Sequence, residues 1–143
     1  MKKIVSIIVF LAVTVASAQK NIYENRKFDE LTEEHEVLAI MPFIAYLELK
    51  EVVDRDELKV LAEREGYAVQ NALETYFSKR KKRKKFNVDF QNIMNTNAIL
   101  AQNGIDYDNL DIHTTQELCK ILDVDGIISG NLNLNILLSE GVP

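Results

Sequence analysis

An unbroken apolar run, Val37-Leu38-Ala39-Ile40-Met41, constrains the fold of this 143-residue chain more than any other feature. Pro42 ends the run and Phe43 follows it. A strand with one face in water alternates polar and apolar residues, and this run contains no polar residue. Such a run is typical of a strand buried on both faces, as in a parallel sheet covered by helices. We therefore expect residues 37–43 to form the central strand of an α/β domain.

The start of the chain has the pattern of a secretory signal peptide, which we assign to residues 1–18. Lys2 and Lys3 precede an apolar stretch from Ile4 to Val15, and Ala16-Ser17-Ala18 forms a small-residue cleavage site. The stretch is shorter than the roughly 20 residues that span a bilayer, which favours cleavage over an amino-terminal membrane anchor. No cysteine stands at the cleavage site. The protein is predicted to be exported, periplasmic or secreted, and not lipid-anchored.

The rest of the chain divides into a flexible lead-in, residues 19–36, and a single α/β domain, residues 37–143. An acidic cap, Asp54 with Glu57 three residues on, predicts a long helix that ends in a basic run. Gly66 lies inside this helix, where glycine costs about 1 kcal/mol relative to alanine, so a break or bend there is one alternative. The strictly alternating segment 86–91 predicts an edge strand.

Two shorter helices and a final strand complete the expected pattern. Gly104 is placed to close the helix 92–103 in a left-handed conformation. Thr114 and Glu117 form a capping box that opens a helix to Leu122. The last strand begins at residue 124 as a buried segment and then alternates leucine or isoleucine with asparagine, which indicates one wet face.

Helical crossovers between these strands imply parallel pairing with right-handed connections. We expect a small three-layer domain with a mostly parallel sheet in which the strands stand in the order second-first-third. The segment 44–50 either extends the first strand or starts a loop. The wet half of the last strand has no predicted partner, and an exposed edge is normally paired or blunted. The domain is therefore expected to be truncated before further antiparallel strands.

The charge distribution is an acidic body with one basic segment. Without Lys2 and Lys3, 15 basic residues stand against 22 acidic ones. Seven of the 15 are consecutive: Lys79, Arg80, Lys81, Lys82, Arg83, Lys84 and Lys85. The dipole at a helix carboxyl terminus stabilises nearby cations by about 0.3–1 kcal/mol each, which accounts for two or three of them. The others predict an anionic-surface binding site, with a merely solvated run as the alternative. A nucleic-acid binder would be basic more widely.

The side chains that could carry chemistry do not converge in the sequence. His35 and His113 lie far apart, and neither has a cysteine or a second histidine nearby. The acidic loop 106–111 lacks the glycine and the glutamate of a calcium loop at the required positions. Ser129 is not in a strand-turn-helix context, and Cys119 lies on an apolar helical face. We expect no metal, no cofactor and no enzymatic activity, with metal-assisted hydrolysis at the acidic loop as the alternative.

Three segments resemble a group of bacterial envelope α/β domains that includes the amino-terminal domain of TolB, CsgG and the penicillin-binding-protein activator LpoB. Residues 37–43 resemble the group's V-A-V-L-P-F strand, and residues 97–105 are similar to its L-x-x-x-G-I/L helix. Residues 117–132 resemble its A-x-x-L-G-V-D-x-V-I-x-G-x-V segment, with Asp123 in place of the glycine before Val-Asp. Members are lipoproteins in the CsgG and LpoB types, but this chain has no lipidation cysteine.

The resemblance implies a non-enzymatic adaptor that binds a protein partner in the cell envelope, and it carries over no catalytic residue. The basic run is not part of the group's pattern, so it suggests an alternative partner: anionic lipid, lipopolysaccharide or a cell-wall polymer. Export argues against nucleic acid as a partner. The sequence leaves the oligomeric state open.

Overall fold

The computed structural model describes residues 25–49, 54–83 and 87–136. The predicted signal peptide and the chain after residue 136 lie outside this part. The elements in chain order are α2 (Phe28–Leu31), β1 (Val37–Ile40), β2 (Ile44–Leu49), α3 (Arg55–Lys82), β3 (Asp89–Phe90), α4 (Ile93–Gln102), the 3-10 helix η1 (Leu110–Ile112), α5 (Thr115–Leu122), β4 (Gly126–Ile128) and β5 (Asn131–Ile136). The α/β fold class is confirmed.

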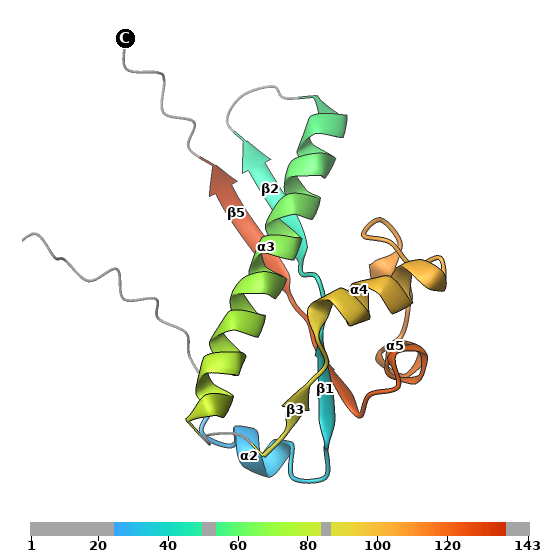
Figure 1. Ribbon diagram of the computed structural model, residues 1–143. Helices are drawn as coiled ribbons and strands as arrows, with labels where there is room; N and C mark the ends of the chain where they lie inside the picture. The colour runs from blue at the N-terminus through green and yellow to red at the C-terminus, as the bar shows by residue number, and fades with distance from the viewer. Residues whose placement is uncertain (1–24, 50–53, 84–86, 137–143) are drawn as a thin grey trace, which may run out of the picture.

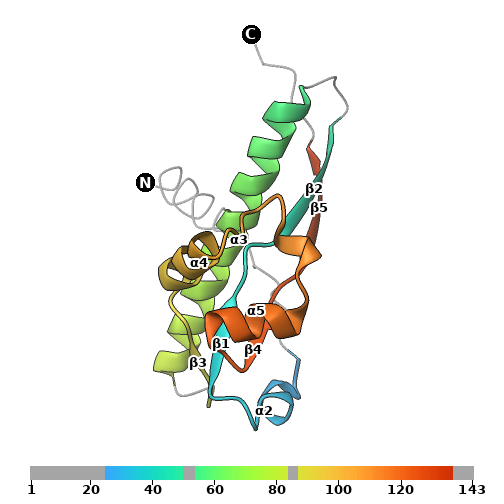
Figure 2. The same cartoon turned by 90° about the vertical axis from the view of Figure 1, so that its right-hand side faces the viewer.

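Strand β1 is the centre of the main sheet, as its apolar sequence predicted. The order is β3-β1-β4, and both pairings are parallel, which confirms the order second-first-third. Alternate residues of β1 enter two different cores: Leu38 and Ile40 pack with Phe77 of α3, while Ala39 packs with Leu118 of α5. Figure 2 shows α5 in front of β1 and β4 and α3 behind them. The strand is therefore buried on both faces in a three-layer arrangement.

A second sheet, with two strands, continues from the main sheet. Strand β2 pairs in parallel with β5 over six residues, from Ile44 with Asn131 to Leu49 with Ile136. Figure 1 shows this ribbon rising along α3, past α4 and α5. The expectation that the wet half of the last strand has no partner is therefore wrong. The segment after Phe43 continues as β2, because Pro42 interrupts the first strand without ending the extended chain.

The ribbon has one covered and one wet face, as the alternating sequence indicated. Asn131, Asn133 and Asn135 are exposed, while Leu132 and Leu134 are half-buried. The leucines stand beside Ala45 and Leu47 of β2, and those two residues lie next to Leu58 and Ala62 of α3. Neighbours in register on parallel strands share a face. Helix α3 therefore covers the leucine face, and the asparagines line the face that is open to solvent.

Helix α3 runs unbroken from Arg55 to Lys82, so no break occurs at Gly66. The glycine is buried, and a Cβ there would lie 2.1 Å from the carbonyl oxygen of Phe43. Glycine at this position lets α3 approach the interruption between β1 and β2 closely. The Phe43 N–H donates to the Gly66 carbonyl over 3.3 Å, which joins the helix to the sheet at this point.

The predicted helix ends are confirmed. The Asp54 carboxylate accepts the Asp56 N–H at the start of α3. Thr114 and Glu117 form both hydrogen bonds of the capping box at α5. Gly104 follows α4 with a φ of +71°. Asp123, which stands where the resembling pattern has glycine, also adopts a left-handed conformation, with a φ of +54°.

Candidate functional site

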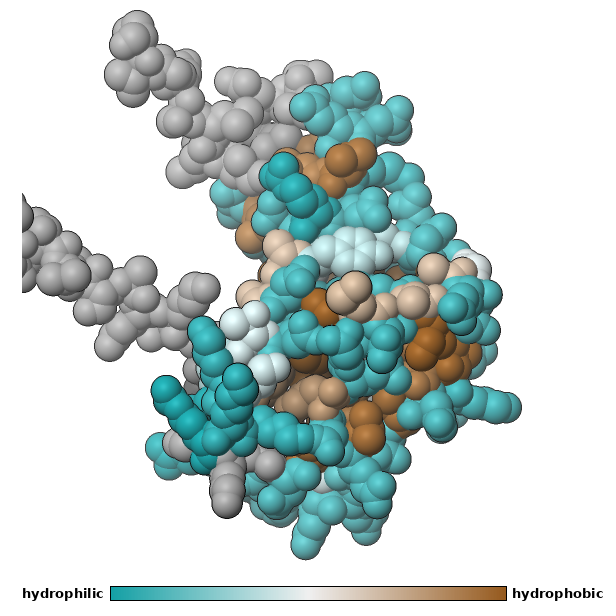
Figure 3. Space-filling view, viewed as in Figure 1, coloured by the Kyte–Doolittle hydropathy of each residue, from teal (hydrophilic) through white to brown (hydrophobic). Residues whose placement is uncertain are grey.

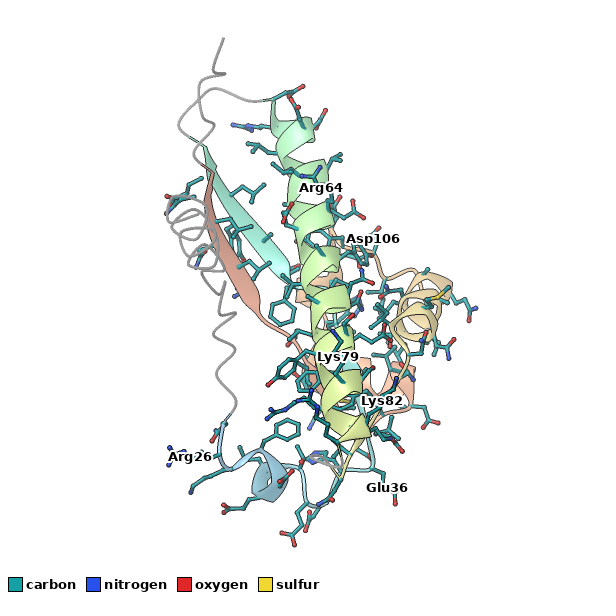
Figure 4. All side chains as sticks on the ribbon, turned by 60° about the vertical axis from the view of Figure 1, so that its left-hand side comes forward. Arg26, Glu36, Arg64, Lys79, Lys82 and Asp106 are labelled. Atoms are coloured by element: carbon teal, nitrogen blue, oxygen red, sulfur yellow. The ribbon has the colours of Figure 1, made fainter. Side chains whose placement is uncertain are left out.

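The predicted basic run lies at the carboxyl end of α3. Lys79, Lys81, Lys82 and Arg83 are exposed and Arg80 is partly buried; Lys84 and Lys85 fall outside the described residues. Figure 3 shows a strongly hydrophilic corner, at the lower left, where α3 ends. Figure 4 shows Lys79 and Lys82 projecting from the last turns of the helix, with Arg26 near α2 at the same end of the molecule.

Two cations of the run have contacts within the protein. The Arg80 guanidinium lies 5.5 Å from the centroid of the Tyr76 ring, a cation–π distance. The Lys81 ammonium forms an ion pair with Asp89 of β3. In the described part of the chain, no carboxylate pairs with Lys79, Lys82 or Arg83. These last three side chains are the ones available to an outside partner.

An aromatic stack fixes the end of α3 on the domain. The Phe77 ring lies between Phe28 of α2, at a centroid distance of 6.2 Å, and Phe90 of β3, at 4.6 Å. Tyr76 meets the same ring edge-on at 5.4 Å. Stacked and edge-to-face arrangements are the preferred geometries of aromatic pairs. The exposed cations therefore project from a helix end that α2 and β3 hold in place.

An acidic segment lies at the same end of the molecule. It comprises α2 and the turn that leads into β1, and Figure 4 places Glu36 near this end. Its acidic residues are Asp29, Glu30, Glu33, Glu34 and Glu36, all of them exposed. In physiological salt, exposed charges are largely screened from one another when they lie more than about 8 Å apart. The segment lowers the net positive charge of this end of the molecule.

The acidic loop 106–111 is ordered by its own hydrogen bonds. The Asp106 carboxylate accepts the N–H groups of Asp108 and Asn109, at 3.0 and 3.1 Å, and the Asn109 side chain accepts the Asp106 N–H. Asp108 forms an exposed ion pair with Lys59 of α3 at 3.2 Å. Among the residues that the structure describes, no three His, Cys, Asp or Glu side chains converge as a metal site requires.

Tyr107 is a structural residue that the sequence did not single out. Its hydroxyl accepts the Ala45 N–H at 2.8 Å and lies 2.9 Å from the carbonyl oxygen of Phe43, to which it can donate. A second acceptor, the Ala62 carbonyl, lies at 3.1 Å. Burial raises the pKa of this phenol, so it stays neutral. Tyr107 thereby joins β1, β2 and α3 where the sheet is interrupted. The one sequence signal for this role is an aromatic residue within a polar loop.

A hollow of about 290 Å³ lies where β1 and β4 end. Ligands of open parallel sheets bind outside the carboxyl ends of the strands. The hollow brings together Asp111, His113 and Ser129. Sequence analysis did not group these three residues. No hydrogen bond within the described residues joins these three side chains. They line an open cavity but do not form a nucleophile–base pair.

The remaining candidate residues lie apart from this hollow. His35 stands beside Gly126 at the amino end of β4, so the two histidines are at opposite ends of the sheet. Cys119 is partly buried on α5. Burial, and to a lesser extent the nearby Asp125 carboxylate, raises the pKa of its thiol. A raised pKa keeps the sulfur protonated, and the thiolate is the reactive form.

No protein-family model, curated protein or solved structure matches this chain. The resemblance to the TolB, CsgG and LpoB group therefore stays a prediction from the residues that carry it. None of the helices in the described ranges has both the length and the apolar character that crossing a membrane needs.

Proposed function

We propose that this chain is an exported, non-enzymatic adaptor domain of the bacterial cell envelope that binds an envelope protein through the basic end of α3. The observation that carries the proposal is the set of exposed cations, Lys79, Lys82 and Arg83, which pair with no described carboxylate. The signal-peptide pattern and the resemblance to envelope adaptors support the location and the class. The Asp106 carboxylate is engaged in a turn, which weakens the case for a hydrolase.

The proposal is tested by photo-crosslinking in the native cell. A crosslinking amino acid is placed at Lys82, and at Lys120 as a control on the exposed surface of α5. We expect a specific protein adduct from position 82 alone. The adduct should be lost when Lys79 and Arg83 are also changed to serine. Equal adducts from both positions, or none from position 82, would contradict an adaptor that works through the end of α3.

Export is tested separately by the intact mass of the protein in each cell fraction. Cleavage before Gln19 predicts a shortened chain in the periplasm or the medium. An uncleaved chain in the cytoplasm would refute export, whatever the crosslinking result.

A second candidate function is direct binding of an anionic polymer or lipid headgroup by the same three cations. The absence of any described pairing carboxylate favours it too, because such side chains can approach a charged surface. Near an anionic membrane each lysine or arginine contributes about 1 kcal/mol. Loss of all three should therefore weaken binding on the order of 100-fold.

The matched comparison uses two triple variants with the same change in charge. One replaces Lys79, Lys82 and Arg83 by serine. The other replaces Lys59, Lys120 and Arg64, three exposed cations elsewhere. Co-sedimentation with phosphatidylglycerol vesicles and with purified wall fragments is measured against salt. Selective loss in the first variant, stronger at low salt, supports this second function. Equal binding by both variants, or binding that salt does not weaken, refutes it.

A further inference from the structure

Among the described residues, the backbone groups on the outer edge of β5 have no strand partner. Strand β5 pairs with β2 on one side, and no other described strand pairs with it; Figure 1 shows it on the outer side of the ribbon. The Ile44 N–H donates to the Gly130 carbonyl. Backbone groups alternate in direction along a strand. The N–H and C=O groups of Asn131, Asn133 and Asn135 therefore point outward.

The other strand edges in the described residues are short or partly covered. Strand β4, at one edge of the main sheet, has only three residues. Strand β3 is two residues long, and its Asp89 is ion-paired with Lys81. The outer edge of β2 is closed at its start by the Tyr107 hydroxyl, which takes the Ala45 N–H. Short length, charge and covering groups are the usual means of blocking edge pairing. Strand β5 has six residues, Asn-Leu-Asn-Leu-Asn-Ile, without charge, proline or glycine.

The sequence of β5 is also self-complementary. Residues 131–135 read Asn-Leu-Asn-Leu-Asn in both directions, with Asn133 at the centre. Two copies that meet antiparallel about a two-fold axis would therefore place asparagine opposite asparagine and leucine opposite leucine. We propose that two copies of this chain pair through the outer edges of β5 and join their ribbons into one four-stranded sheet.

The palindrome and the outward backbone groups together set the register of this pairing. Asn133 stands opposite its own counterpart, and Asn131 stands opposite Asn135 of the other copy. Directly opposite side chains on antiparallel strands interact most strongly. The asparagine amides form a row on the wet face, and the leucines of both copies meet on the face that α3 covers. The edge carries no charge in either copy, so no like charges oppose each other along it.

The first test is the mass of the purified protein in solution. Sedimentation is measured at roughly 1 and 200 µM, because a small interface is expected to have a micromolar dissociation constant. We expect twice the chain mass at the higher concentration. Hydrogen exchange at the same two concentrations should show the Asn133 amide protected only at the higher one. A monomer at both concentrations would overturn the proposal and would leave the edge to another protein or to the chain itself.

The second test uses charge pairs to check the register. Asn131→Lys combined with Asn135→Lys places lysine opposite lysine twice in the dimer, and we expect at least a tenfold weaker association. Asn131→Lys combined with Asn135→Glu places lysine opposite glutamate, and we expect association to return. Both variants lose the same two exposed asparagines, and circular dichroism checks that both fold. Equal association of the two variants would overturn pairing through this edge.

Discussion

Gly66 occupies the closest approach of α3 to the sheet. A Cβ at this position would lie 2.1 Å from the Phe43 carbonyl oxygen and 2.7 Å from the Tyr107 ring. Helix propensity alone favours Gly66→Ala by about 1 kcal/mol. Backbone and a buried ring cannot move away cheaply, and overpacking costs about 1–3 kcal/mol or more. We expect Gly66→Ala to lower the free energy of unfolding, measured with urea.

The matched control is Ala68→Gly, two residues along the same helix on its exposed side. It should cost only the helix-propensity difference of about 1 kcal/mol. A gain in stability from Gly66→Ala would show that the contact between helix and sheet is looser than described.

Asp125 ties the segment before β1 to the start of β4. Its carboxylate accepts the N–H groups of Val37 and Glu36, each at 2.8 Å. These two hydrogen bonds, the Val37 bond first, hold the pKa of Asp125 below its ordinary value of 3.8. A lowered pKa in the folded state means that the charged form stabilises the fold above pH 3.8. This contribution is lost as the pH falls through the folded-state value.

We therefore expect Asp125→Asn to melt at a lower temperature than the parent protein at pH 7. The difference between the two melting temperatures should shrink below pH 3.8, where the unfolded carboxyl is already protonated. Glu117→Gln is the control, because the Thr114 N–H and hydroxyl also lower the pKa of Glu117 but at a different site. A difference that stays constant from pH 7 to pH 2.5 would exclude the charge of Asp125 as its cause.

The interruption between β1 and β2 is the element that depends most on a distant part of the chain. Replacing Tyr107 by phenylalanine keeps the ring but removes the hydroxyl that accepts the Ala45 N–H. A polar group left without a partner costs about 1–3 kcal/mol. We expect Tyr107→Phe to lower the urea midpoint accordingly, whereas Tyr46→Phe, at a residue 53% exposed, should change it little. Equal effects at both tyrosines would contradict the bridging role of Tyr107.

The elements that follow a local rule could be predicted, and those that depend on a distant partner could not. The apolar residues of the run 37–41 indicate by themselves that the strand is buried. The capping box is formed by Thr114 and Glu117, which are only three residues apart. The sequence left residues 44–50 open between a strand and a loop, because the partner of β2, strand β5, is more than 80 residues away in the chain. The same holds for Gly66, whose importance comes from Phe43. Helix propensity counts a glycine in a helix as destabilising. It contains no information about a distant backbone group that leaves no room for a Cβ.

The candidate surfaces also differ in how much of each could be predicted from the sequence. The basic run is visible in the sequence, but its division into engaged and exposed cations depends on Tyr76 and Asp89. The hollow that brings His113 and Ser129 together is formed by the way α5 packs against the strand ends, and no spacing in the sequence indicates it. The palindrome in β5 is visible in the sequence. Its use in pairing can be inferred only from the structure, because the pairing of β5 with β2 shows which edge of β5 is open.

On the scale of the complete molecule, α2 joins the segment before β1 to the core. Phe28 stacks on Phe77 and packs against the core that contains Leu38 and Ile40. A chain that starts at His35 lacks α2 but keeps Glu36, whose N–H binds Asp125. A partly buried aromatic pair and its apolar area contribute about 1–3 kcal/mol. We expect this shorter chain to unfold at a lower urea concentration than a chain that starts at Asn25.

Phe28→Ala in the chain that starts at Asn25 separates the aromatic contact from the rest of the segment. If the stack is the main link, this single change should account for most of the loss. The shorter chain also loses the acidic residues Asp29, Glu30, Glu33 and Glu34 beside the basic end of α3. Its binding to anionic vesicles should therefore be stronger, because fewer negative charges oppose Lys79, Lys82 and Arg83. Unchanged urea midpoints in both variants would place the start of the stable unit after α2, at β1.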